Sequence, residues 1–140
     1  MAIFLGLSPV FSGCQTVGYF DTKEDVTPAE DLHERLLKDV VLTIQNNYAP
    51  AKTRFHFPHG KEKLAESLEA TLRKYGYGVS SGKKNRENSE IPLAYKFSEI
   101  QPGLYVLRVL IGENFQINRL YSMEKDGGYV AAGPLLMRRD

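Results

Sequence analysis

The 140-residue sequence contains a single cysteine, Cys14. One thiol cannot form an intramolecular disulfide, so a disulfide framework is excluded. In an oxidising compartment an unmodified spare cysteine would also be a chemical liability. The sequence therefore raises the question of what Cys14 does.

The sequence also lacks a surplus of charge of either sign. It has 18 basic and 17 acidic residues, which gives a formal net charge of +1. Bulk attraction to phosphates therefore cannot support strong binding of nucleic acid, and we expect no direct contact with nucleic acid. A hydrophobic fraction of 42% and a charged fraction of 25% are ordinary for a globular domain, which excludes wholesale disorder.

No long hydrophobic run follows the N-terminus. A helix that spans a bilayer needs about 20 apolar residues, and no segment after residue 13 approaches that length. The apolar residues 1–13 are themselves too few to span. Any attachment to a membrane must therefore come from a covalent lipid.

Sequence motifs for catalysis are missing too. Neither GxSxG nor a Cys/His pairing occurs, and the GYG of residues 76–78 follows a predicted helix instead of preceding one, unlike a phosphate-binding loop. His56 and His59 are three residues apart and His33 is the third histidine, but no carboxylate or thiol lies near them at ligand spacing. We interpret His56 and His59 as surface residues at a strand end. The sequence therefore predicts no enzyme activity, no cofactor and no metal site.

The residues before Cys14 indicate its role. Residues 1–13 are uncharged and largely apolar, like the short hydrophobic region of a signal peptide. Ser12 and Gly13 then precede Cys14, and two small residues before a cysteine are typical of the lipid-modification site of bacterial lipoproteins. The alternative is that residues 1–10 form a buried strand and Cys14 is a small core residue. We favour lipidation, because the polar residues that follow at once are typical of a tether.

This interpretation divides the chain into three parts. Residues 1–13 are predicted to be a lipoprotein signal peptide, and residues 14–26 a flexible tether that starts at lipidated Cys14. Residues 27–140 are long enough for one modest core and are predicted to form a single periplasmic domain.

The domain alternates between helix and strand patterns. Thr27-Pro28-Ala29-Glu30 has the form of a capping box, so a helix should begin at Thr27 and end before Pro50. A second helix is expected from about Lys61 to a stop at Gly76. Period-two patterns and turn residues predict strands at residues 52–57, 77–80, 93–97, 104–111, 115–121 and 129–136. This order predicts an α+β fold, in which two helices pack on one face of a mostly antiparallel, curved sheet.

The last predicted strand, residues 129–136, is open to two interpretations. Gly133 and Pro134 interrupt it, and Ala131 and Ala132 are small. Such an edge strand could pair with the sheet of another subunit. Alternatively, Pro134 is there to block that pairing.

Several short stretches resemble the TrbH family of conjugal transfer lipoproteins, which combine an N-terminal lipidation site with a Y-x-P-A-x-T-R-F stretch. Residues 48–55 read YAPAKTRF, and residues 64–78 resemble the family's helix that ends in a Gly-Tyr pair. PLAY at residues 92–95 and GLY at residues 103–105 resemble the next two strands. The resemblance covers roughly residues 39–139, and its specificity lies in the order and spacing of these stretches.

The resemblance implies a structural subunit, and not an enzyme, of a type IV secretion apparatus that moves DNA between bacteria. It implies a place at the periplasmic face of the outer membrane, with other channel subunits as partners in an oligomeric ring. The protein would contact the membrane through the lipid on Cys14, and Gln15 in place of an aspartate agrees with the outer membrane. A rival hypothesis is a lipoprotein that acts alone, in exclusion of an incoming cell or in ligand recognition.

Overall fold

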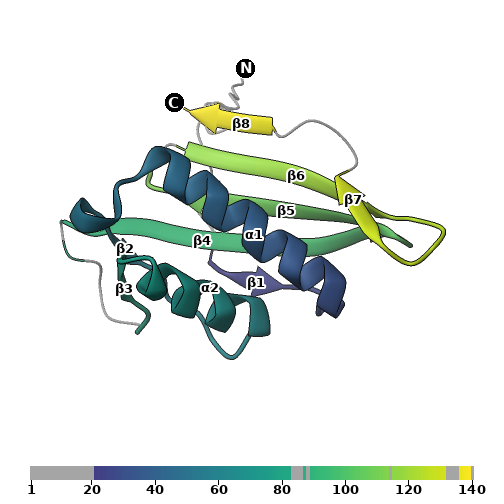
Figure 1. Ribbon diagram of the computed structural model, residues 1–140, viewed down its shortest axis with the longest axis horizontal. Coiled ribbons are helices and arrows are strands. Elements are labelled where there is room, and N and C mark those ends of the chain that lie inside the picture. Colours follow the sequence, from purple (N-terminus) through teal and green to yellow (C-terminus); the bar gives the residue numbers. More distant parts are fainter. Residues whose placement is uncertain (1–20, 83–86, 88, 114, 132–135, 140) are drawn as a thin grey trace, which may run out of the picture.

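The computed structural model describes residues 21–82, 87, 89–113, 115–131 and 136–139. Within them, one sheet of eight strands has the order β3-β2-β4-β5-β6-β7, with β1 paired to β4 and β8 paired to β6. The long strands β4, β5 and β6 form an antiparallel centre, and short strands complete both edges (Figure 1). The strand bounds are β1 Lys23–Glu24, β2 Arg54–His56, β3 Gly78–Ser80, β4 Ile91–Gln101, β5 Leu104–Ile111, β6 Phe115–Met123, β7 Tyr129–Ala131 and β8 Leu136–Arg139.

Both helices lie on the same face of this sheet (Figure 1). α1 (Glu30–Asn47) crosses the central strands, and α2 (Lys63–Lys74) lies beside it over the part of the sheet near β2 and β3. A 3-10 helix, η2 (Pro50–Lys52), leads from α1 to β2. The predicted α+β fold, with two helices on one face of a mostly antiparallel curved sheet, is confirmed. We call the opposite side, on which the described residues place no helix, the rear face.

The helix α1 begins later than the capping box predicts. Its N-cap is Ala29 and not Thr27, no side chain caps it, and the first intrahelical bond runs from the amide of His33 to the carbonyl of Ala29 over 2.7 Å. Glu30 and Asp31 supply negative charge to the first turn, where it interacts favourably with the helix dipole. The prediction of a Thr27 cap is therefore wrong, because charge in the first turn takes the place of a side-chain cap.

The segment that leads into α1 is bound to the sheet. β1 pairs in parallel with β4, the amide of Asp25 donates to the carbonyl of Phe97 (2.9 Å), and Thr22 Oγ1 accepts from the amide of Tyr95 (3.2 Å). The hydroxyl of Tyr95 also donates to Glu24. Residues 22–25 are therefore not part of a flexible tether, because they form hydrogen bonds with the edge of β4. Residues 14–20 of the predicted tether lie outside the described residues.

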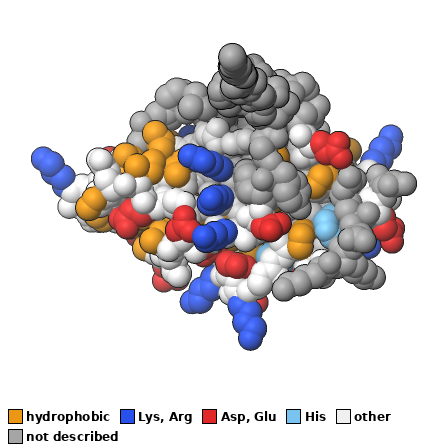
Figure 2. Space-filling model, turned by 180° about the vertical axis from the view of Figure 1, so that it is seen from behind, with side chains coloured by type: hydrophobic (Ala, Val, Ile, Leu, Met, Phe, Trp, Pro, Cys, Tyr) orange, Lys and Arg blue, Asp and Glu red, His pale blue; other side chains and the backbone are white. Residues whose placement is uncertain are grey.

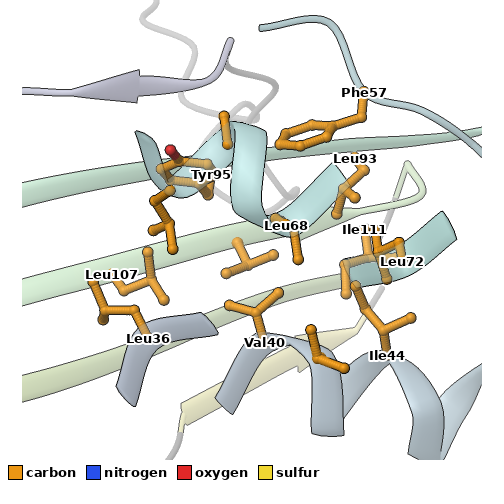
Figure 3. Packing of buried hydrophobic residues seen from close by; sticks show 14 of the residues in the cluster. Leu36, Val40, Ile44, Phe57, Leu68, Leu72, Leu93, Tyr95, Leu107 and Ile111 are labelled. Atoms are coloured by element: carbon orange, nitrogen blue, oxygen red, sulfur yellow. The ribbon is translucent and has the colours of Figure 1, made fainter. Parts of the chain in front are cut away.

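The core fills the space between the helices and the sheet (Figure 3). Side chains at helical spacing on α1 and α2 meet alternate residues of β4 and β5, as period-two strands require. Full burial of each large aliphatic side chain contributes about 1.5–3 kcal/mol. The contacts come chiefly from Leu36, Val40, Ile44, Leu68, Leu72, Leu93, Tyr95, Leu107 and Ile111.

Candidate functional site

The edge of the sheet at β6 is the best candidate for an interaction site. β8 pairs with one end of β6, at residues 115–118, and β7 pairs with the other end, at residues 121–123. Within the described residues, Arg119 and Leu120 have no strand partner on this side. Of the predicted strand at residues 129–136, the structure has β7 at Tyr129–Ala131, and β8 (Leu136–Arg139) overlaps the prediction only at Leu136. The interrupting residues, Gly133 and Pro134, lie outside the described part of the chain.

Charged side chains converge where this edge meets α1. Arg35 and Asp39 are one turn apart on α1, and Arg119 faces them from β6. The Nε atoms of Arg35 and Arg119 each lie 3.8 Å from Asp39 Oδ2, and the hydroxyl of Tyr121 donates to the same oxygen over 2.6 Å. The Asp39 carboxylate therefore interacts with two guanidinium groups and with one phenol hydroxyl.

One buried donor at this site lacks a hydrogen bond. Arg119 Nε is buried and has no hydrogen-bond acceptor within the described part of the chain. A pocket of about 10 Å³, which holds about one water, lies beside it and is bordered by Asp39, Thr43 and Arg119. Burial and the hydrogen bond to Asp39 raise the pKa of Tyr121, so its hydroxyl stays a donor at neutral pH. One water in this pocket would give Arg119 Nε an acceptor.

The histidines are structural and not exposed. The side chain of His59 is 8% exposed and its Nε2 lies 2.7 Å from Glu69 Oε1, while His56 is 12% exposed with Nδ1 3.4 Å from Ser80 Oγ. His33 Nε2 lies 3.1 Å from Ser67 Oγ and links the two helices. The interpretation of His56 and His59 as surface residues is wrong. No group of three or more potential metal ligands occurs among the residues that the structure describes.

A second polar cluster surrounds Glu90, which is 5% exposed. Glu90 Oε2 accepts from Ser80 Oγ at 2.7 Å and from Arg54 Nε at 3.3 Å, and Oε1 accepts from the amide of Glu87 at 3.0 Å. Ser80 Oγ donates to Glu90 Oε2, and His56 Nδ1 lies farther from the same hydroxyl, at 3.4 Å. The cluster therefore ties β2 and β3 to the segment before β4.

This cluster predicts acid sensitivity. The amide of Glu87, with Ser80 and Arg54, holds the pKa of Glu90 below its ordinary value of 4.5. Because the folded-state pKa is the lower one, the carboxylate stabilises the domain above about pH 4.5, and this contribution is lost as the pH falls through the folded-state pKa. Glu90→Gln should lower the free energy of unfolding at pH 7 by about 2 kcal/mol. Urea titrations from pH 7 to pH 3 should show a shallower acid loss for this variant, whereas exposed Glu124→Gln should follow the parent.

Comparison with known proteins gives the family. A sequence model of the conjugal transfer protein TrbH matches residues 14–140. The chain belongs to the TrbH family. Neither a curated protein nor a solved structure matches it.

The stretches that resembled TrbH pack against each other. Phe55 lies between the rings of Tyr48 and Tyr77, with ring centroids 5.8 and 5.6 Å away. The hydroxyl of Tyr77 donates to the carbonyl of Tyr48 over 2.7 Å. Gly76 ends α2 with φ of +94°, as predicted, and a Cβ on Gly78 would lie 2.9 Å from Arg54 Cγ. These TrbH motifs therefore build the junction of α1, β2 and α2.

Cys14, the predicted lipidation site, lies outside the described residues. Neither helix of the described part has the length and apolar character needed to cross a bilayer. Sequence reasoning missed the roles of Arg119 and Asp39, because nothing in their local patterns indicates that they meet.

Proposed function

We propose that this TrbH-family protein is a non-enzymatic structural subunit of a type IV secretion apparatus for conjugal DNA transfer. In this proposal acylated Cys14 holds it at the periplasmic face of the outer membrane. The observation that carries the proposal is the family match, which begins at Cys14 and leaves out the apolar residues 1–13. That range is what would remain after removal of a lipoprotein signal peptide.

The anchor is physically sufficient. One acyl chain binds a bilayer only marginally, whereas two or more hold a protein stably. Cys14 and Asp21 are seven residues apart, so the chain between them spans at most about 25 Å. The domain would therefore stay close to the leaflet that contains its lipid.

The domain would act through its contacts with neighbouring channel subunits in a ring. Among the described residues, β7 and β8 leave Arg119 and Leu120 of β6 without a strand partner on this edge, and the side chain of Arg119 is 26% exposed there. A carbonyl or carboxylate from a neighbouring subunit would bind the exposed part of the Arg119 guanidinium. Short, interrupted edge strands also limit unwanted pairing of free subunits.

Two measurements on protein extracted from donor-cell membranes test the proposal. Intact mass should show loss of residues 1–13 and acyl chains on Cys14, and the protein should co-purify with a large channel complex. An unmodified full-length mass would contradict the anchor. A free monomer in cells that still mate would contradict the structural role and support the rival, a lipoprotein that acts alone in exclusion or recognition.

A further inference from the structure

Three basic side chains lie in register across the rear face. Lys23 of β1 pairs with Lys96 of β4, and Lys96 pairs with Arg108 of β5. Paired residues on adjacent strands present their side chains on the same face, with strands about 4.8 Å apart. Figure 2, which views this face, shows a column of basic side chains at its centre. We call Lys23, Lys96 and Arg108 the basic row.

The basic row is only partly neutralised. Lys23 Nζ lies 3.4 Å from Asp25 Oδ1, but Lys96 and Arg108 form no ion pair among the described residues. Like charges directly opposite each other on neighbouring strands destabilise a sheet. Lys96 and Arg108 therefore carry an electrostatic cost that a bound anion would relieve.

The chain enters the domain on this same side. Asp21 and Thr22 border a pocket together with Ala94 and Leu110. Ala94 and Leu110 are paired, and each is two residues from a member of the basic row, so they share the rear face. Cys14, seven residues before Asp21, can lie at most about 25 Å away. A lipid on Cys14 would thus hold a membrane within reach of the basic row.

We propose that the basic row binds phosphodiester groups of anionic phospholipids, so that the rear face rests on the leaflet that holds the acyl anchor. The choice of a membrane as occupant rests on the proposed lipidation of Cys14. In this orientation α1 and α2 face away from the bilayer (Figure 1). Asp21 and Asp25 lie on the membrane side and weaken the attraction. Asp25 interacts electrostatically with both Lys23 and Lys96, so Arg108 is the least neutralised member of the basic row.

Vesicle binding by the unacylated full chain tests the contact separately from the anchor. Cell-free synthesis without lipid-modifying enzymes supplies the protein, and sedimentation measures its partition onto phosphatidylcholine vesicles with and without phosphatidylglycerol. Each cation near an anionic leaflet raises partition about fivefold, so Lys96→Gln with Arg108→Gln should lower the phosphatidylglycerol-dependent partition about 25-fold. Lys61→Gln with Lys63→Gln, which removes the same charge near the start of α2, should change it less than about twofold.

A gain of phosphatidylglycerol-dependent binding provides a second test, with a change of the opposite sign. Asp25→Asn removes a negative charge and frees Lys23, so partition should rise about fivefold. Lys96→Arg keeps the charge and should bind like the parent. Thermal unfolding of the Lys96→Gln, Arg108→Gln variant should occur at or above the parental midpoint, because like-charge repulsion is removed.

Several outcomes would overturn the proposal. They are equal binding with and without phosphatidylglycerol, equal losses in the two double variants, or preferential binding of an acidic peptide or a DNA duplex. Intact mass of the cell-extracted protein reports on the anchor alone. Acylated Cys14 without vesicle binding would therefore contradict only the lipid contact, and vesicle binding with unmodified Cys14 would contradict only the anchor.

Discussion

Phe55→Ala should lower the free energy of unfolding by about 4 kcal/mol, which is a large fraction of the stability of a small domain. Phe55 is fully buried and packs between Tyr48 and Tyr77. Truncation removes the buried ring and leaves a cavity that its neighbours fill only partly. Because these rings join α1, β2 and the segment after α2, the loss affects the whole junction. Urea denaturation of the purified domain measures the change.

Two further variants separate the cost of the cavity from the cost of losing the aromatic ring or an exposed side chain. Phe55→Leu keeps most of the apolar volume and should cost about 1 kcal/mol. Leu42→Ala removes a side chain that is 46% exposed and should change stability by less than about 0.5 kcal/mol. A small loss for Phe55→Ala would contradict the role of this junction in stabilising the domain.

The parts of the fold that depend on local pattern were predictable. β5 has the predicted bounds, Leu104–Ile111, because its residues suit a buried strand and Gly103, with φ of +80°, makes the turn before it. Gly76 ended α2 for the same local reason, since only glycine adopts its positive φ without strain. The two-helix, one-sheet arrangement followed from the order of these elements.

The parts that depend on distant partners were not predictable. β1 has two residues, Lys23 and Glu24, with little intrinsic preference for strand, and its place depends on Tyr95 more than 70 residues later. The charge cluster joins Asp39 to Tyr121 across 82 residues. A sequence read by periodicity describes Asp39 as the polar side of a helix. Only the tertiary fold shows that Asp39 interacts with Arg119 and Tyr121.

Cys14→Ser should remove the protein from the outer-membrane fraction and reduce conjugal transfer to the level of donor cells that lack the protein. In the proposed lipidation the Cys14 thiolate is the nucleophile that accepts a diacylglycerol, and a serine hydroxyl is a far weaker nucleophile at neutral pH. Without acylation the signal peptide should stay attached, so intact mass should show residues 1–140 and no lipid. Ser12→Ala keeps both the thiol and a small side chain, and this control should fractionate and transfer like the parent.

A second variant separates loss of the anchor from loss of export. Replacing residues 1–14 with the cleavable leader of a soluble periplasmic protein should deliver residues 15–140 to the periplasm without a lipid. Tethering raises the effective concentration of a subunit near its partners, so the untethered domain should support little transfer even when it is folded and exported. If that soluble domain restored transfer fully, its protein contacts alone would suffice. The anchor at Cys14 would then have no part in the assembly of the apparatus.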